Sequence, residues 1–274
     1  MGKFSFCRWR TPSASAPGRA ASRRFTEPPF SPAILPYSFD GIFKVIADNL
    51  ASVRHRMAAA AARAGRNASD VRLVVVTKTV PVEKIAQARA AGACLFGENR
   101  VQEAVDKIDA LAGQDLAWHF IGHLQKNKVK YVIGRFGLIH SVDSAALAGR
   151  IGALSLERGL ETAILIQVNI SGETSKSGVS PDDLEETLLA VSGVSGVRVE
   201  GLMTIPPYDP DPEASRPFFA RLRELARTFE GAGGASLREL SMGMSGDFEV
   251  AIEEGATLVR VGTAIFGKRP NPGG

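Results

Sequence analysis

Short apolar runs alternate with amphipathic stretches along the chain from residue 41 onward. The apolar runs show no polar alternation, which is typical of strands that are buried on both faces in a parallel sheet. We predict eight such strands, at residues 73–78, 94–99, 118–122, 137–142, 163–169, 199–205, 239–244 and 258–262.

Helical periodicity fills the segments between these strands, at residues 82–92, 101–112, 126–134, 144–159, 181–193, 217–231 and 247–255. An Ala-rich helix at 40–65 precedes the first strand and ends at Gly65. The repeated alternation predicts one α/β domain at residues 41–270, a single (β/α)8 TIM-type barrel with an extra N-terminal helix. An open doubly wound sheet is the alternative, because the sequence alone does not show closure.

Residues 1–40 differ from the rest of the chain in composition and charge. They are rich in Pro and Ser and show no sustained period, which predicts a disordered N-terminal extension. Their Arg content would suit a transit peptide, but an upstream start-site artefact or a species-specific tail is at least as good an explanation. Six basic and two acidic residues give this segment a net charge of +4, which equals the charge of the whole chain.

The remaining body is therefore formally neutral. A nucleic-acid-binding domain would carry clustered basic charge, so the balance argues against a nucleic-acid partner. No apolar run approaches the roughly 20 residues that a membrane-spanning helix needs. The chain has only two cysteines, which favours a reducing compartment, and we expect a cytoplasmic protein.

Polar residues follow the predicted strands, and in a TIM-type barrel these strand ends meet at one mouth, where the chemistry occurs. We expect the following residues to line that mouth: Lys78, Glu98, Asn99, His119, His123, His140, Asp143, Asn169, Met203, Thr204, Ser245, Arg260, Gly262 and Thr263. His119 and His123 have the spacing of a metal-ligand pair, but no Cys or carboxylate set completes a zinc site, and we predict no metal.

The last two strand ends have the composition of a phosphate site. In "SMGMSGDFEVAIEEG", glycines and Ser245 precede a helix that Ser245 or Asp247 would cap, so free backbone N–H groups and a hydroxyl would face outward. "RVGTAIFG" adds Gly262, which permits close backbone approach, and the hydroxyl of Thr263. Each motif alone could serve only a turn or a cap. The Gly-Lys-Ser/Thr signature of a nucleotide P-loop is missing, so a small phosphorylated molecule is favoured.

Lys78 ends the apolar strand "LVVVTK". It could be a solvated charge at the rim. A lysine that loses hydration there would instead have a lowered pKa, which makes its neutral amine available for a Schiff base. A phosphorylated aldehyde would satisfy both the lysine and the phosphate loop, and pyridoxal 5'-phosphate (PLP) is the common one.

Several motifs together resemble the pyridoxal phosphate homeostasis protein family, single-domain relatives of the alanine racemase barrel. They are "VVVTKT", "LFGENRVQEAVDK", "WHFIGHLQKNKVK", "IHSVDS", "GLMTI" and "LSMGMSGDFEVAIEEGATLVRVGTAIFG", and they occur in the order and spacing of the family between about residues 41 and 267. The resemblance implies a PLP-binding protein that maintains and supplies intracellular vitamin B6, affects amino-acid pools indirectly and has no established catalytic turnover.

The resemblance also implies roles for individual residues. Lys78 would carry PLP as an aldimine, Asn99 would lie near the ring and Arg260 would face the pyridine nitrogen. Arginine holds its proton, so this nitrogen would stay unprotonated and PLP would be a weaker electron sink. The implied cofactor-binding set is Lys78, Asn99, Met244, Ser245, Arg260, Gly262 and Thr263.

Two other functions remain open at this stage. A PLP-dependent amino-acid racemase could use the same Lys78, but it needs a second acid or base across the cofactor, and the chain has only three tyrosines, Tyr37, Tyr131 and Tyr208. A barrel aldolase could form a Schiff base with a sugar phosphate. For the homeostasis protein we expect PLP-dependent apoenzymes as partners and a monomer or weak dimer.

Overall fold

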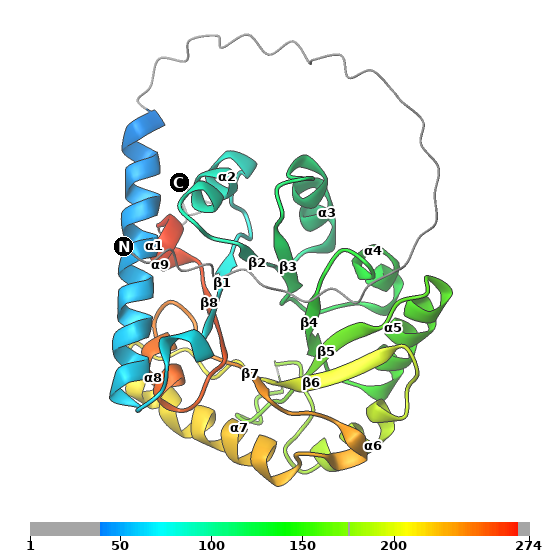
Figure 1. Cartoon of the computed structure of the whole chain (residues 1–274). Coiled ribbons are helices and arrows are strands. Elements are labelled where there is room, and N and C mark those ends of the chain that lie inside the picture. Colours follow the sequence, from blue (N-terminus) through cyan, green and yellow to red (C-terminus); the bar gives the residue numbers. More distant parts are fainter. Residues whose placement is uncertain (1–38, 175, 268–274) are drawn as a thin grey trace, which may run out of the picture.

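A closed parallel β-barrel forms the centre of the molecule. The computed structural model describes residues 39–174 and 176–267, so the predicted extension at 1–40 lies outside the described residues except for its last two positions. The strands pair in sequence order and β1 also pairs with β8, which closes the ring (Figure 1). The predicted TIM-type barrel is confirmed, and the open sheet is wrong. The strands are β1 (Arg72–Val76), β2 (Leu95–Glu98), β3 (Ala117–Phe120), β4 (Leu138–Val142), β5 (Thr162–Gln167), β6 (Val197–Met203), β7 (Glu239–Ser241) and β8 (Leu258–Val261).

Each strand divides its side chains between two hydrophobic layers, because successive residues point to opposite faces. On β1, Val74 belongs to a small cluster inside the barrel, whereas Val75 belongs to the large cluster between the strands and the helices. Both residues are fully buried, which explains why the strands read as continuous apolar runs rather than as alternating patterns.

The predicted helices lie outside the barrel at the expected places, with boundaries that differ by a few residues. They are α2 (Val82–Ala90), α3 (Val101–Ala110), α4 (Val129–Val132), α5 (Ala145–Glu157), α6 (Leu184–Ser192), α7 (Arg216–Thr228) and α8 (Phe248–Glu253). The predicted helix at 126–134 is split into the 3-10 turn η2 (Lys126–Lys128) and α4. A short helix, α9 (Thr263–Phe266), was not predicted and follows β8 directly.

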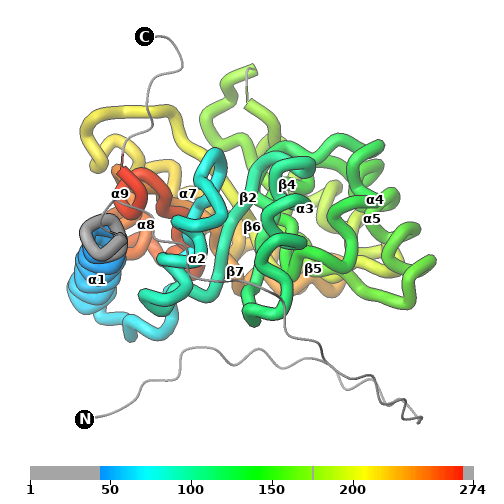
Figure 2. The backbone as a smooth tube through the Cα atoms, turned by 90° about the horizontal axis from the view of Figure 1, so that it is seen from above, coloured from blue at the N-terminus to red at the C-terminus, as the bar shows by residue number. Residues whose placement is uncertain are grey.

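The extra helix α1 (Phe39–Arg63) crosses the outside of the barrel beside α2, α8 and α9 (Figure 2). Its Leu50, Val53 and Ala60 are buried in the large core. Asn49 donates a hydrogen bond of 3.0 Å to the carbonyl of Ile265 in α9. The helix thus covers the place where the last strand meets the first. None of the described helices is long and apolar enough to span a membrane.

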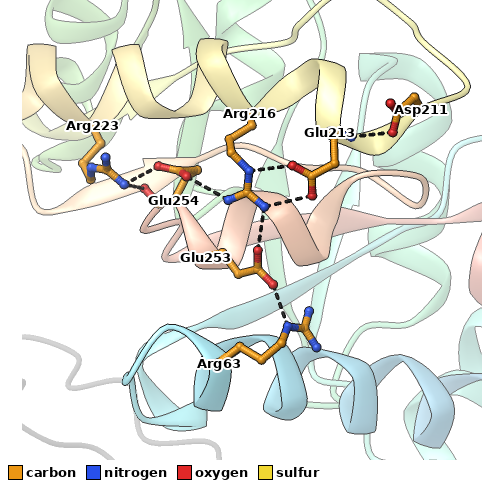
Figure 3. A network of polar contacts seen from close by, with 7 residues as sticks. All are labelled: Arg63, Asp211, Glu213, Arg216, Arg223, Glu253 and Glu254. Atoms are coloured by element: carbon orange, nitrogen blue, oxygen red, sulfur yellow. Dashed lines mark hydrogen bonds and ion pairs between the residues drawn. The ribbon is translucent and has the colours of Figure 1, made fainter.

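Ion pairs connect α1, α7 and α8 at the edge of the barrel, together with the 3-10 turn η3 (Pro212–Ser215) (Figure 3). Arg216 lies at the centre, with its guanidinium 2.6 Å from Glu213, 2.7 Å from Glu253 and 2.9 Å from Glu254. These hydrogen bonds, above all the one with Glu213, raise the pKa of Arg216 above its usual value. Glu253 also accepts a hydrogen bond of 2.7 Å from Arg63 of α1. The network therefore fixes α8 against two other helices.

Candidate functional site

Lys78 lies in the turn that follows β1. Thr77, one residue earlier, is fully buried and its hydroxyl donates a 2.6 Å hydrogen bond to Glu98, which places this side chain on the outer side of the barrel wall. The alternation of side chains then assigns Lys78 to the side of the mouth. Lys78 is half-buried. The next residue, Thr79, has a positive φ of 61°.

The end of β8 is adjacent to the end of β1. Arg260 pairs in register with Val74 and is 5% exposed. Its guanidinium donates hydrogen bonds to the hydroxyl of Ser241 on β7 and, at 3.0 Å, to the carbonyl of Thr204 after β6. Burial lowers the pKa of Arg260 to about 10, so the guanidinium remains charged at neutral pH. Among the described residues it forms no salt bridge, and its hydrogen bonds go to uncharged groups.

Two fully buried histidines extend the series of polar contacts that begins with Arg260 and Ser241. Ser241 Oγ lies 2.8 Å from His140 Nδ1, and His140 Nε2 lies 2.9 Å from His119 Nδ1. Burial, followed by the positive charge of Arg72, lowers the pKa of His119 to about 3, and burial also places the pKa of His140 well below its usual value. Both rings are therefore neutral at physiological pH. The sequence showed both histidines at strand ends but not their connection to Arg260.

The loop after β7 and the start of α9 form a cluster of polar donors. Ser245 Oγ lies 3.2 Å from the amide of Gly262, 3.4 Å from the amide of Ala264 and 3.2 Å from the hydroxyl of Thr263. Within the described part of the chain, the amides of Ser245 and Gly246 donate to no acceptor. These amides and the two hydroxyls are the donors that an anion needs.

The predicted capping of α8 is only partly correct. Asp247 occupies the N-cap position, but its carboxylate makes no capping hydrogen bond to the helix. The carboxylate instead accepts a hydrogen bond of 2.6 Å from the amide of Met244 and one of 3.0 Å from the hydroxyl of Ser215. Ser245 does not cap α8 and turns toward α9. Asp247 therefore holds the loop through the amide of Met244, while the hydroxyl of Ser245 contributes to the donor cluster.

Gly262 lies in close contact with the end of β1. A Cβ at this position would lie 3.1 Å from the carbonyl oxygen and 3.3 Å from the Cβ of Val76 at the end of β1. The φ of Gly262 is −124°, so the requirement is for space rather than for an unusual backbone conformation. This contact brings the donor cluster beside the strand that ends at Lys78.

Asn99 follows β2, the other neighbour of β1. Its amide oxygen Oδ1 is buried and has no hydrogen-bond partner within the described structure. A buried polar atom of this kind costs free energy unless a ligand or water satisfies it. Lys78, Asn99, Arg260 and the donor cluster thus lie at the ends of β1, β2 and β8 and in the loop after β7, all neighbours in the ring.

Some residues that we expected at the mouth lie elsewhere. Glu98 is fully buried and bonds Thr77 and Lys107 of α3, so it faces the helical layer. His119 lies inside the barrel, whereas His123 is exposed and has Nδ1 3.7 Å from Asp143 Oδ2. The two histidines that had metal-ligand spacing are thus separated. Successive side chains on β2 point to opposite faces, which puts Glu98 on the helical side, whereas His123 lies beyond the end of β3.

The remaining geometry suits a phosphorylated aldehyde. A lysine follows one strand, an unsatisfied amide oxygen follows the next, and two hydroxyls with free amides lie on the other side. A buried cation on β8 adds positive charge. These residue types fit a phosphorylated aldehyde such as PLP.

Comparisons with known proteins identify relatives over most of the chain. Residues 49–270 match the family described as alanine racemase, N-terminal domain. The pyridoxal phosphate homeostasis protein of Aquifex aeolicus is 47% identical over 222 residues, which cover 81% of this chain and 97% of that protein. The protein of the same name from Escherichia coli K12 is 44% identical over 229 residues, covering 82% and 97%. The structure of PipY from Synechococcus elongatus with PLP bound has a TM-score of 0.72 and 39% identity, covering 81% of this chain and 100% of that one.

Proposed function

The chain belongs to the pyridoxal phosphate homeostasis protein family, and we propose that it binds PLP at the mouth of the barrel and takes part in intracellular vitamin B6 homeostasis. The observation that carries the proposal is the position of the Lys78 turn between an unsatisfied amide and a cluster of anion donors. The PLP bound in PipY, a protein of the same fold, supports it.

The phosphate would be held by the loop after β7 and by the start of α9. Ser245 and Thr263 would donate their hydroxyl hydrogens, while the missing side chain of Gly262 lets this backbone lie directly beside Val76 of β1. The backbone amide of Met244 donates a hydrogen bond to the carboxylate of Asp247, which holds the loop in place. Such charge-assisted hydrogen bonds are about twice as strong as neutral ones.

Lys78 is the proposed point of covalent attachment. Its amine would hold the aldehyde carbon of PLP covalently, with the aldehyde oxygen released as water. Asn99 would lie near the ring from the end of β2. Arg260 would face the pyridine nitrogen, where a cation that keeps its proton at neutral pH would not protonate the ring.

An unprotonated pyridine nitrogen favours a carrier of PLP over a PLP-dependent catalyst. PLP would supply electron-withdrawing chemistry when its pyridine nitrogen is protonated, and Arg260 at that nitrogen would withhold the proton. We therefore propose supply of PLP to PLP-dependent apoenzymes as the role of the protein, in the cytoplasm and as a monomer or weak dimer. Indirect effects on amino-acid pools would follow from this supply.

Reduction of the PLP-loaded protein with borohydride tests the attachment site. We expect the mass of reduced PLP on the peptide that contains Lys78. Lys78→Ala should lose covalent attachment but keep weaker, phosphate-anchored binding, and Lys84→Ala is the matched control on the neighbouring helix. Label on a peptide with Lys84 or Lys126 instead would refute the assignment. Rapid racemisation of a free amino acid, lost in Lys78→Ala, would replace the carrier role with that of an enzyme.

A further inference from the structure

One buried cluster contacts the backbone on both sides of Lys78. Lys107 of α3 donates a 2.6 Å hydrogen bond from Nζ to the carbonyl of Thr77, the residue before Lys78. Glu103, one helical turn earlier in α3, accepts a hydrogen bond of 2.5 Å from the amide of Thr79, the residue after it. Lys107 Nζ joins the two contacts, because it also bonds Glu103 and lies 2.8 Å from Glu98.

The turn that this cluster holds is strained. Thr79 has a φ of 61°, in the left-handed region, which is unfavourable for a β-branched residue. Such a conformation persists only where surrounding contacts over-determine it, and strain of this kind concentrates at functional sites. The hydroxyl of Thr79 adds a 2.6 Å hydrogen bond to the carbonyl of Lys78 itself. The strained residue is therefore attached directly to Lys78.

Burying the charged side chains of this cluster behind the barrel wall costs free energy. The side chain of Lys107 is 7% exposed and that of Glu98 is fully buried, with its second oxygen unpartnered within the described residues. Burial raises the pKa of Glu98 above its usual value despite the hydrogen bonds from Lys107 and Thr77. Apolar residues of similar volume at such positions are often neutral or stabilising. A buried ion cluster that contacts both neighbours of one lysine thus indicates a role at that lysine.

We propose that Lys107, Glu98 and Glu103 are positioning residues that hold the strained turn at Thr77–Thr79 and thereby direct Lys78 Nζ at the aldehyde carbon of PLP. This inference rests on the proposed function. The cluster lies on the helical side of the barrel wall and contacts the backbone of the turn. It acts by limiting the conformations of the turn, so its loss should slow covalent attachment more than it weakens non-covalent binding.

Lys107→Met tests the proposal, since Met fills the same volume without a donor. Its rate of covalent attachment should fall at least about tenfold, measured from the absorbance change on PLP addition and by borohydride quenching. Affinity for pyridoxine 5'-phosphate, an alcohol that cannot form the covalent bond, should stay within about twofold of wild type. Exposed Lys126→Met is the matched control and should attach PLP at the wild-type rate.

Two further measurements separate positioning from a general structural effect. In the cofactor-free protein, reductive methylation of Lys78 by formaldehyde, followed by mass spectrometry, should be as fast in Lys107→Met as in wild type, because the small reagent needs no fixed direction. Adding Thr79→Gly to Lys107→Met should recover part of the attachment rate, since glycine adopts a positive φ without strain.

The possible results distinguish this inference from the proposed function. Attachment at the wild-type rate in folded Lys107→Met would overturn the positioning role and leave PLP binding at Lys78 intact. The positioning role would also be overturned if Lys107→Met lost affinity for pyridoxine 5'-phosphate by the same factor as it lost attachment rate. The same holds if adding Thr79→Gly did not recover any of the attachment rate. If Lys107→Met does not fold, Glu103→Gln, at a side chain 24% exposed, replaces it with the same expectations. Failure of the wild-type protein itself to attach PLP at Lys78 would refute both proposals.

Discussion

The buried histidine His119 predicts how the stability of this protein depends on pH. The ring is fully buried, its Nδ1 lies 2.9 Å from His140, and its Nε2 has no partner in the described structure. Burial lowers its folded-state pKa to about 3, while the unfolded chain titrates near the ordinary value of about 6.5. His119→Asn removes this titration and keeps a polar atom near the position of Nδ1.

The sign and size of the effect follow from proton linkage. Below about pH 6.5 the unfolded chain binds a proton at His119 that the folded protein does not, so stability falls as the pH falls toward about 3. At about pH 5.5 the loss from this one group is roughly 1.4 kcal/mol, and at about pH 7.5 it is below about 0.1 kcal/mol. His119→Asn should therefore lose about 1.4 kcal/mol less than wild type between these two conditions. The pKa of His140 is also lowered, by burial first and then by His119, so this group likewise makes stability fall as the pH falls.

Urea unfolding of the cofactor-free protein measures this difference, with tryptophan fluorescence and far-UV circular dichroism as probes. The free energy of unfolding would be determined at about pH 7.5 and pH 5.5 for wild type, His119→Asn and the exposed control His55→Asn. Carboxylates titrate mainly below this range, and their contributions cancel between variants. An equal loss of stability in wild type and His119→Asn would show that His119 is not held neutral by burial.

Two further variants test the phosphate cluster and the ion-pair network. Ser245→Ala combined with Thr263→Ala should weaken binding of pyridoxine 5'-phosphate by about a hundredfold or more, because two charge-assisted hydrogen bonds are lost and each contributes about 1.5–3 kcal/mol. Calorimetry with Ser69→Ala, an exposed serine before β1, as control would detect it, and an unchanged affinity would exclude these hydroxyls as phosphate ligands. Arg216→Ala should lower the melting temperature through loss of about 1 kcal/mol, and the difference should narrow in high salt. A difference that does not depend on salt would show that packing, not charge, is the contribution of Arg216.

The sequence by itself determined the order of strands and helices and the end of the strands at which the candidate site lies, whereas closure of the ring came from the structure. Eight continuous apolar runs predict strands buried on both faces, and the helices between them require a parallel sheet. All eight strands, the leading helix and seven of the connecting helices are found within the described residues. Because the chemistry of a TIM-type barrel lies at the carboxyl ends of its strands, the same pattern placed Lys78, Asn99 and Arg260 at the same end of the barrel.

The tertiary structure decided which of these residues meet and which face they occupy. Glu98 and Asn99 are neighbours in the sequence, yet Glu98 bonds Lys107 of α3 whereas the side-chain oxygen of Asn99 has no partner in the described structure. The contact of His140 with Ser241 joins residues 101 positions apart, and that of Lys107 with Thr77 joins residues 30 apart. Hydrophobic periodicity is a local property and records burial, not the partner of a polar atom. Only closure of the ring brings these distant groups within hydrogen-bonding distance.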